Sequence, residues 1–463
     1  MPNHIPINAF SMNSLGHLSP GLWRHPRDQS RRYRDLDYWL ELAQTLERGK
    51  IDVLFLADVL GVYDVYGGTP DAALSRGVQV PLNDPLAIIP AMASVTEHLG
   101  FAMTAAVSYE HPFPFARRMS TLDHLTKGRV GWNVVTGYLD SGAVNFGVSA
   151  QEAHDRRYEI ADEYLEVCYK LWERSWEDGA VIADAATGVF TDPTKVHPIN
   201  HRGEFFTVPG IHLSEPSPQR TPVIFQAGAS SRGLQFSAKH AEGIFVAAPS
   251  KSVLTSQVTG IRAALTAAGR SPDGVTILNQ QTVVVAETDA EAHKLFEGYL
   301  EFASEVGALT LMSGWTGVDF SKLDLDSTFE NQESNAIQSV IRAFSRADPS
   351  KQWTIREIAE YAKLGGDGPV VVGSAETVAD QLEAWVAETG VDGFNIAATA
   401  VPESFVQIVD LLIPELQKRG RYKTEYSEGT LREKLGGGAA RIAAPHPAAA
   451  VAIDGASSFN FCS

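Results

Sequence analysis

The chain has 463 residues, of which 44% are hydrophobic and 20% are charged, and its formal net charge is −18. This composition is typical of an ordinary globular protein, long enough for one large α/β barrel with insertions or for two ordinary domains. The negative charge argues against nucleic acid and anionic membranes as partners.

The two cysteines, Cys168 and Cys462, lie far apart and match neither a disulfide framework nor the spacing of a metal site. The first residues, MPNHIPINAF, lack a basic stretch followed by an apolar one, and no apolar run reaches the roughly 18 residues that a membrane span needs. We therefore expect a cytoplasmic protein with no membrane segment and no bound metal.

Strands and helices alternate along the first part of the chain. Apolar runs predict strands, and the spacing of apolar residues predicts the helices between them. In order, the predicted elements are a strand over 5–10, a helix over 36–48 that Gly49 ends, a strand over 52–56, a helix from Asp84–Pro85 to Gly100, a strand over 101–107 and a helix over 115–125.

The most informative stretch is Gly128–Gly147, GRVGWNVVTGYLDSGAVNFG. Its apolar run Arg129–Val135 is bounded by glycines, which is typical of a strand buried on both faces. A loop follows, and then a long helix with His154 and Tyr158, which a capping box of Ser149 and Glu152 would begin. A strand, a polar loop and a helix form the unit in which α/β enzymes place ligand sites, although such a unit can also serve packing alone.

The alternation continues after an interruption at about 180–220. Further strands are predicted over 222–226, 243–247 and 275–286, and, after a second interruption at about 300–368, over 370–372 and 393–397, with helices over 374–388 and 405–418. About eight strands with helical crossovers favour a TIM-type (β/α)8 barrel, and a doubly wound open sheet is the alternative. We expect one barrel domain over residues 1–435 and a disordered Ala/Gly-rich tail over 436–463.

Polar residues gather where the predicted strands end, which is where barrels place their sites. Asp58 follows the second strand, Thr104 lies in the third, and Asn133 and Thr136 belong to the fourth. Each of them could instead cap or pack locally, but together they recur at one end of the sheet. We therefore predict that they contact a ligand.

A Gly/Ser turn, Gln226–Gly233, follows a later strand and opens a helix. Backbone N–H groups of such a turn and of a helix N-terminus bind anions, and the hydroxyls of Ser230 and Ser231 can donate to phosphate. An ordinary turn is the alternative interpretation. On the preceding long helix, His154 and Tyr158 are four residues apart and share one face, as a ligand-binding pair or as an amphipathic surface pair.

Five segments carry a family resemblance: LERGKIDVLFLAD (46–58), VTEHLGFAMTAA (95–106), ARRMSTLDHLTKGRVGWNVVT (116–136), HDRRYEIADEYLEVCYKLW (154–172) and PVIFQAGASSRG (222–233). With GVDGFNI (390–396) they span the chain to about residue 435. In this order they resemble the bacterial-luciferase-like flavin monooxygenases, in the branch of the nitrilotriacetate, dibenzothiophene-sulfone and dimethyl-sulfide monooxygenases.

The resemblance implies a barrel with insertions, reduced FMN (FMNH2) as co-substrate and O2 as oxidant. FMN brings the chemistry, and the protein orients it and excludes water. The family's flavin contacts, carried over residue by residue, fall on Asp58, Thr104, His154, Tyr158 and Ser230, with Gly228 and Ser231 at the phosphate and Asn133 under the ring. The insertion at 300–368 would serve as a lid.

The chain has no GxGxxG that opens a helix after a strand, which favours a separate NAD(P)H:FMN reductase as partner. The resemblance also suggests a homodimer or homotetramer. A deazaflavin-dependent oxidoreductase and a non-catalytic flavin-binding protein are the alternative functions on such a barrel.

The stretches WRHP (23–26), ADVLGVYDVYGG (57–68) and SGWTG (313–317) are most similar to the dimethyl-sulfide enzymes. The sulfone branch typically has a histidine where Trp315 stands, and the long-chain alkane branch has one where Tyr138 stands. We expect C–S cleavage of a small apolar thioether, with sulfone, haloaromatic and aminopolycarboxylate substrates as alternatives. The predicted catalytic residues are His17, Tyr138 and Trp315, and the predicted substrate contacts are Trp23 and Tyr63.

Overall fold

The computed structural model describes residues 4–228, 230–329, 336–345, 348, 351–436 and 438–451. Within these ranges no helix combines the length and the apolarity that crossing a bilayer requires.

Eight parallel strands close into a barrel. Their order around it is β10-β9-β4-β3-β2-β1-β13-β11, and β11 pairs back with β10. This closing pair confirms the predicted TIM-type barrel and excludes the open, doubly wound sheet. The strands are β1 (Ile7–Met12), β2 (Val53–Ala57), β3 (Gly100–Ala106), β4 (Val130–Val135), β9 (Val223–Ala227), β10 (Gly243–Val246), β11 (Thr276–Ala286) and β13 (Gly393–Ala397).

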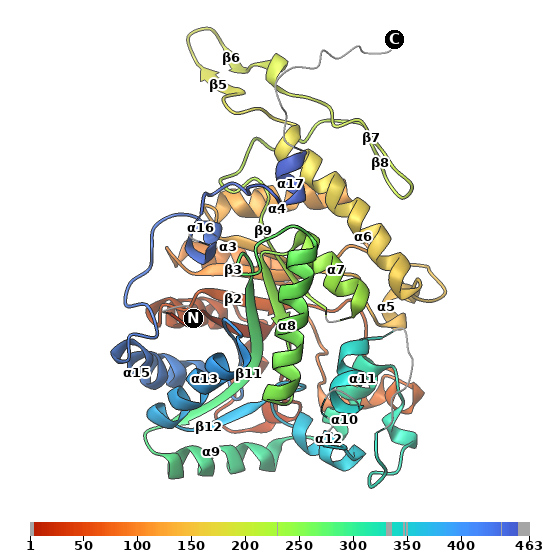
Figure 1. The fold of residues 1–463 in the computed structure, drawn as a ribbon, viewed down its shortest axis with the longest axis vertical. Helices are drawn as coiled ribbons and strands as arrows, with labels where there is room; N and C mark the ends of the chain where they lie inside the picture. The colour runs from red at the N-terminus through yellow and green to blue at the C-terminus, as the bar shows by residue number, and fades with distance from the viewer. Residues whose placement is uncertain are drawn as a thin grey trace.

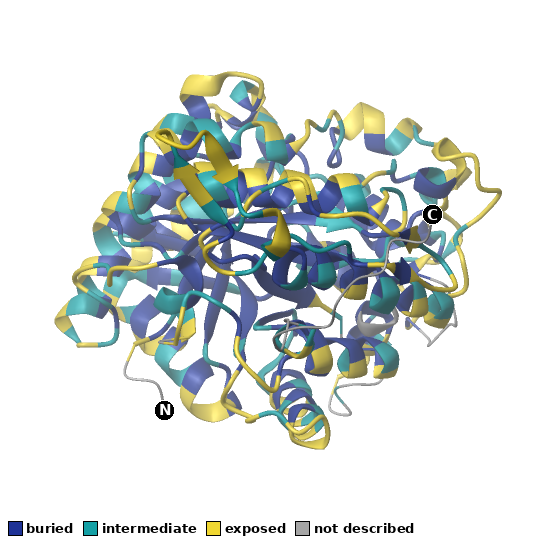
Figure 2. Ribbon diagram, turned by 90° about the horizontal axis from the view of Figure 1, so that it is seen from above, coloured by how far each residue is buried: buried dark blue, intermediate teal, exposed yellow. Residues whose placement is uncertain are grey.

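Helices cover the outside of the barrel (Figure 1). Buried residues therefore occupy the middle of the ribbon, and exposed residues lie mostly on the outer helices and loops (Figure 2). The covering helices are α1 (Leu36–Arg48), α3 (Ile89–Ser94), α4 (Pro112–Leu125), α6 (His154–Tyr169, continued by η5, Lys170–Arg174), α7 (Ser231–His240), α8 (Lys251–Ala267), α13 (Ala375–Thr389), and α14 (Glu403–Gln407), η8 (Ile408–Leu412) and α15 (Ile413–Lys418) in series.

Nine runs were candidates for eight barrel strands, and one of them lies outside the closed ring. The run at 370–372 forms β12 (Val370–Ser374), which among the described strands pairs only with the last part of β11, Thr282–Ala286. β12 and the part of β11 that it pairs with are both apolar. Composition alone therefore does not distinguish a strand of the closed barrel from a strand added at its edge. The pairing partner makes the difference.

Some of the predicted helix ends and caps are confirmed, and one is wrong. Helix α1 spans 36–48 with Gly49 as its C-cap, as predicted, and Asp84 caps the single turn η4 (Pro85–Ala87) by accepting from Leu86 N. The capping box of Ser149 and Glu152 is wrong, because α6 begins at His154 with Ala153 as N-cap. Gln151, just before it, is instead bound to Tyr109, Leu139 and Asp140.

Two long segments interrupt the alternation. Between α6 and β9 lie two hairpins that extend beyond the barrel in Figure 1, β5 (Val181–Asp184) with β6 (Val189–Thr191) and β7 (His201–Arg202) with β8 (Thr207–Val208). Between β11 and β12 lie α9 (Asp289–Phe302), α10 (Glu305–Thr316), α11 (Gln338–Ser345) and α12 (Ile355–Ala362). The remaining short helices are α2 (Asp71–Arg76), α5 (Asp140–Asn145), η1 (Leu22–Arg24), η2 (Ser30–Arg32), η3 (Tyr66–Gly68), η6 (Pro193–Lys195) and η7 (Phe320–Lys322).

The prediction of a disordered tail from residue 436 is wrong for residues 438–451. Arg441 forms an ion pair of 2.7 Å with the buried Glu173, and His446 Nε2 donates a hydrogen bond of 2.7 Å to the carbonyl of His240. Ala448, in α17 (Pro447–Ala450), is fully buried. Small residues fit closely against α6, which composition alone does not reveal; residues 452–463, with Cys462, lie outside the described residues.

The segment after α15 fills the end of the barrel at which the parallel strands begin, their amino-terminal end. Leu431, in α16 (Leu431–Gly436), is buried with the interior side chains Val53, Phe55 and Val223. A Cβ added to Gly100 would lie only 2.6 Å from Leu431 Cδ1, so this strand start has room for glycine alone. The barrel is thus closed at this end and open at the other.

Candidate functional site

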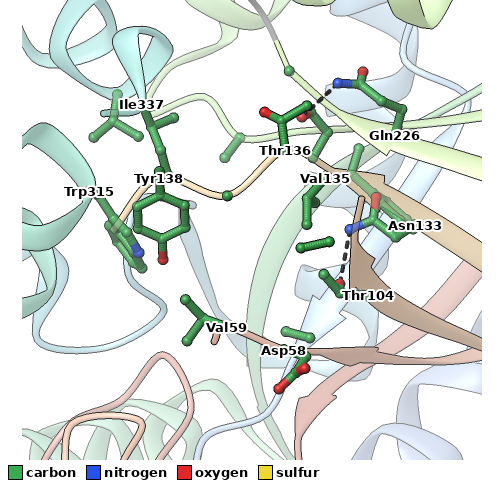
Figure 3. Close-up of a pocket in the computed structure, with 18 of the residues that line it drawn as sticks. Asp58, Val59, Thr104, Asn133, Val135, Thr136, Tyr138, Gln226, Trp315 and Ile337 are labelled. Carbon is green, nitrogen blue, oxygen red and sulfur yellow. Dashed lines mark hydrogen bonds between the residues drawn. The ribbon is translucent and has the colours of Figure 1, made fainter. Parts of the chain in front are cut away.

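A cavity of about 330 Å³ lies at the carboxyl ends of the barrel strands. Side chains from β1, β2, β3, β4, β9 and β10 line it, together with residues of α6 and α10. Figure 3 shows two sides that differ in chemistry, with Thr104, Asn133 and Gln226 on one and Tyr138 and Trp315 on the other. This is the end of a barrel at which enzymes of this architecture hold their ligands.

The polar side is built on neighbouring strands. Thr104 on β3 is the register partner of Asn133 on β4, and Asn133 Nδ2 donates a hydrogen bond of 3.0 Å to Thr104 Oγ1. Gln226 on β9 donates from Nε2 to the carbonyl of Ala227 at 2.9 Å. Asn133 Oδ1 and Gln226 Oε1 are buried and accept no hydrogen bond from the described residues. Such acceptors are costly unless a ligand donates to them.

Helix α6 and the turn between β9 and α7 extend the polar side. His154 and Tyr158 lie one helical turn apart with ring centroids 5.3 Å apart, and both line the cavity. A Cβ added to Gly228 would lie 3.2 Å from the Tyr158 hydroxyl oxygen, so Gly228 lies close to that hydroxyl. Ser230 Oγ caps α7 by accepting from Gly233 N at 2.9 Å. A hydroxyl at the start of a ten-residue helix is well placed for an anion.

The aromatic side consists of Tyr63, Tyr138 and Trp315, the last from α10. The hydroxyls of Tyr63 and Tyr138 share a hydrogen bond of 2.6 Å, and Trp315 Nε1 donates to the Tyr63 hydroxyl at 3.2 Å. Burial raises the pKa of Tyr63 to about 12 and that of Tyr138 well above its ordinary value. Both tyrosines are therefore protonated at neutral pH.

The neighbouring hydrogen bonds determine where the hydroxyl protons of Tyr63 and Tyr138 point. Gln79 Nε2 donates to the carbonyl of His17 at 3.1 Å, which leaves Gln79 Oε1 to accept from Tyr63 at 2.9 Å. Tyr63 has a single hydroxyl proton, so the bond between the two tyrosines is donated by Tyr138. Tyr138 therefore keeps oxygen lone pairs, and no proton, for a ligand.

The floor of the cavity is apolar. Phe10 stacks on Phe55 at 4.9 Å between ring centroids, and Phe55 stacks on Phe245 at 4.4 Å. His17 lies edge-on to Phe10 at 4.5 Å. Burial lowers the pKa of His17 to about 3, so its ring is neutral at physiological pH.

Two carboxyl groups line the cavity. Burial, and then the nearby charge of Asp84, raise the pKa of Asp58 to about 7, against a stabilising bond from the Val59 backbone. Burial also raises the pKa of Asp367 to about 6, and hydrogen bonds from its own backbone and from Gln280 oppose the rise. Each carboxyl group is thus ready to hold a proton in mildly acidic solution.

Most of the residues predicted from the sequence meet in this cavity, namely His17, Asp58, Tyr63, Thr104, Asn133, Tyr138, His154, Tyr158, Gly228, Ser230 and Trp315. Trp23 and Ser231 do not line it. The Trp23 indole donates to the carbonyl of Arg76 at 3.0 Å. Ser231 is exposed at the first position of α7, because Ser230 takes the capping position before it. The geometry gives no support to a substrate contact by Trp23 or a side-chain phosphate contact by Ser231.

Sequence reasoning missed Arg157, Asp367 and Gln79 as lining residues. Arg157 had a signal, since it is three residues after His154 and so shares its helix face. Asp367 lies in the run Gly365–Gly368, GGDG, which indicates a tight turn but not its partner. Gln79 lines the cavity and is bound there to His17 and Tyr63. These contacts are long-range in sequence, so no local pattern reveals them.

Comparison with known proteins shows similarity along almost the whole chain. The family model described as "Luciferase-like monooxygenase" matches residues 14–393. The dimethyl-sulfide monooxygenase of Hyphomicrobium sulfonivorans is 51% identical over 97% of this chain and 94% of its own sequence. The long-chain alkane monooxygenase of Geobacillus thermodenitrificans is 49% identical over 97% of this chain and 98% of its own.

Solved structures agree with this similarity. The crystal structure of the Hyphomicrobium protein superposes with a TM-score of 0.90, over 97% of this chain and 96% of that one. A riboflavin lyase, solved with modified FMN and riboflavin, superposes with a TM-score of 0.91 at 34% identity, over 97% of this chain and 100% of that one.

Proposed function

The chain belongs to the luciferase-like monooxygenase family, and from this we propose that it is the oxygenating component of a two-component system, which uses FMNH2 and O2 to oxidise a small organosulfur compound. The proposed reaction is cleavage of a thioether C–S bond. The observation that carries it is the two-sided cavity, polar beside α6 and α7 and aromatic beside α10.

The polar side fits a flavin. Reduced flavin is rich in N–H groups, and Asn133 Oδ1 and Gln226 Oε1 are buried acceptors that need donors. Gly228, Ser230 and the start of α7 suit the phosphate. In this proposal Thr104, Asn133, His154, Tyr158 and Ser230 bind FMNH2, with Asp58 at the same site. The crystal structure of the similar riboflavin lyase is named with modified FMN.

The aromatic side fits a small uncharged substrate. A volume of about 330 Å³ is at the low end of the range for ligand pockets, so little space remains beside a seated flavin. Tyr63, Tyr138 and Trp315 are neutral, His17 is neutral, and Asp367 would repel an anion. This environment favours a thioether over an aminopolycarboxylate, and the small volume disfavours long alkanes and fused aromatic sulfones.

The proposed roles follow from this chemistry. A bound reduced flavin supplies the electrons that activate O2. The protein's contribution is to orient flavin and substrate and to keep water out, and the stacked floor of Phe10, Phe55 and Phe245 serves the second task. A separate NAD(P)H:FMN reductase would provide the reduced flavin, because the sequence has no dinucleotide-binding GxGxxG unit.

The test is a reconstituted assay with FMN, NADH, a generic flavin reductase and separate substrates. Dimethyl sulfide is expected to consume one O2 and one NADH per methanethiol and formaldehyde formed, with water as the other product. Dibenzothiophene sulfone and a long-chain alkane are expected to give no product. Turnover of the sulfone or of the alkane alone would overturn the thioether proposal, and O2 uptake without any oxidised substrate would overturn the assignment to organosulfur compounds.

A further inference from the structure

Asp367 lies in a tight turn that is anchored to a strand of the barrel. The turn is Gly365–Gly368, after α12, and Gln280 on β11 donates from Nε2 to the carbonyl of Gly365 at 2.7 Å. A Cβ added to Gly365 would overlap the hydroxyl of Thr282, so glycine allows the turn to lie this close to β11. The position of Asp367 is therefore set by β11.

The turn places Asp367 on the aromatic side of the cavity. A Cβ added to Gly366 would lie 2.9 Å from Trp315 Cη2, so the turn touches this ring, and Asp367 itself lines the cavity. Burial is the main cause of the raised pKa of Tyr63 and of Tyr138, and the charge of Asp367 adds to both. The carboxylate thus acts on the space that the three aromatic residues enclose.

No cation among the described residues forms an ion pair with this carboxylate. Burial raises the pKa of Asp367, and the hydrogen bonds that oppose the rise come from its own backbone and from Gln280, which are uncharged. Lys363, the nearest lysine along the chain, pairs with Glu305 and Glu360 instead. A buried carboxylate without a cation is costly, so a cationic ligand would offset this cost and an anionic ligand would add repulsion.

Aromatic rings beside a carboxylate are the surroundings in which proteins bind ammonium groups and other organic cations. We propose that Asp367 selects the charge of the substrate, so that the cavity accepts neutral thioethers and thioethers that carry an ammonium group, and rejects carboxylated ones. The inference rests on the proposed thioether function. It adds to that function a specificity-determining residue and a second class of substrate.

The chemistry of an ammonium thioether is the same as that proposed for dimethyl sulfide. In 2-(methylthio)ethylamine the S-methyl carbon is oxidised and its bond to sulfur breaks, which gives 2-aminoethanethiol and formaldehyde. One oxygen atom of O2 enters formaldehyde and the other leaves as water, and FMNH2 supplies the two electrons. The ammonium group takes no part in the bond changes, and its pairing with Asp367 holds the substrate on the aromatic side.

The experiment measures the binding of three thioethers of similar size to the full-length protein saturated with oxidised FMN. Methyl propyl sulfide, 2-(methylthio)ethylamine and (methylthio)acetate are neutral, cationic and anionic at pH 8, where Asp367 is ionised. Without NADH and reductase there is no turnover, and the S-methyl proton NMR signal of each ligand reports its dissociation constant. We expect the cation to bind wild type at least as tightly as the neutral thioether, and the anion at least about tenfold more weakly.

Asp367→Asn keeps the shape of the side chain and removes its charge. We expect this variant to bind the anion about tenfold more tightly than wild type does, the cation about 3- to 10-fold more weakly, and the neutral thioether within about threefold. Unchanged binding of the neutral thioether also reports an intact fold. Asp367→Ser removes the charge as well and suits a turn, and it decides the question if Asp367→Asn does not fold.

Glu360→Gln is the matched control. Glu360 is an exposed carboxylate on α12, a few residues before the same turn, and it pairs with Lys363 outside the cavity. Its replacement changes the net charge of the protein by the same amount as Asp367→Asn does. We expect it to keep the wild-type order of the three affinities.

The outcomes distinguish the inference from the function on which it rests. A wild-type protein that binds (methylthio)acetate as tightly as methyl propyl sulfide overturns the inference. An unchanged order of affinities in the Asp367 variants also overturns it, because the charge of Asp58 or of the whole protein would then select the ligand. Both results leave the thioether function standing. A wild-type protein that binds FMN but none of the three thioethers overturns the proposed function, and the inference with it.

Discussion

Ser230 has two tasks at a single position of the chain. Its hydroxyl accepts from Gly233 N and so caps α7, and the same residue lines the cavity beside Tyr158. If this hydroxyl binds phosphate as proposed, helix stability and binding are coupled, because the capping geometry fixes where the hydroxyl lies.

Replacing Ser230 by alanine should therefore weaken FMN by about 1–2 kcal/mol, the worth of a hydrogen bond to a charged group. The lost cap should also lower the free energy of unfolding by about 1 kcal/mol. Fluorescence titration and thermal unfolding measure the two effects. Ser231→Ala is the matched control, since Ser231 is exposed outside the cavity and should leave the affinity unchanged. Equal dissociation constants for wild type and Ser230→Ala would remove Ser230 from the phosphate site.

Asp58 makes the stability of the protein depend on pH. Its pKa is raised from 3.8 to about 7 in the folded protein, so the folded state binds the proton more tightly than the unfolded state. Stability contributed by this group is present below pH 4 and is lost as the pH rises to 7.

Asp58→Asn removes this loss. The variant should match wild type near pH 4 and exceed its free energy of unfolding by about 4 kcal/mol at pH 8. Urea unfolding at a series of pH values measures the difference. Parallel curves for the two proteins across pH 4–8 would contradict the raised pKa.

At the scale of the elements, α10 is fitted closely against the aromatic side of the cavity. A Cβ added to Gly314 would overlap the ring of Tyr63, which carries the bonds to Gln79, Tyr138 and Trp315. The glycine thus allows a helix from the second interruption of the barrel to touch a loop that follows β2.

Gly314→Ala should displace Tyr63 and cost about 1–3 kcal/mol of stability, as overpacking of a core does, and it should lower kcat/KM for the thioether. Gly298→Ala in α9 is the control, because a Cβ there meets open space and alanine favours helix by about 0.5–1 kcal/mol. Thermal unfolding and steady-state kinetics of both variants test this prediction. A Gly314→Ala variant with wild-type stability and wild-type kinetics would contradict it, because α10 would then have moved without displacing Tyr63.

Elements that depend on local pattern could be predicted from the sequence. Strands buried on both faces are continuous apolar runs, so β2, β4 and β9 were found, and α1 was found from its periodicity and its terminal glycine. The start of α6 was missed, because Gln151 and its tertiary bonds outweigh a local capping box. The position of β12 was missed because strand pairing is long-range.

The site divides in the same way. Ser230 and the pair His154 and Tyr158 follow from a turn motif and from helical spacing, and both signals are local. Asp367 and Gln79 depend on which distant residue each one meets, Gln280 for the first and Tyr63 for the second. The periodicity of the sequence does not predict such long-range contacts.

At the scale of the whole molecule, the two ends of the barrel have separate tasks. Leu431 is 1% exposed and fills the closed end, whereas the ligand cavity lies at the other. Stability and binding should therefore respond independently to substitutions at the two ends.

Leu431→Ala should cost about 2–5 kcal/mol of stability, as other buried leucines do, and should leave the affinity for FMN unchanged. Leu125→Ala is a suitable control, because Leu125 is 56% exposed at the end of α4 and should change stability by less than about 0.5 kcal/mol. Urea unfolding and flavin titration give the two readings. A variant that loses FMN affinity as strongly as stability would contradict the separation.

The pairing of β1 with both β2 and β13 has a consequence for the newly made chain. β1 is translated before the other barrel strands, but one of its two neighbours, Gly393–Ala397, is translated only after all of them. Until then β1 keeps one edge of unpaired backbone groups, which is a template for pairing with another chain. The ring can close only after β13 has been synthesised, so we expect this protein to depend on chaperones more than a protein whose neighbouring strands are consecutive in sequence.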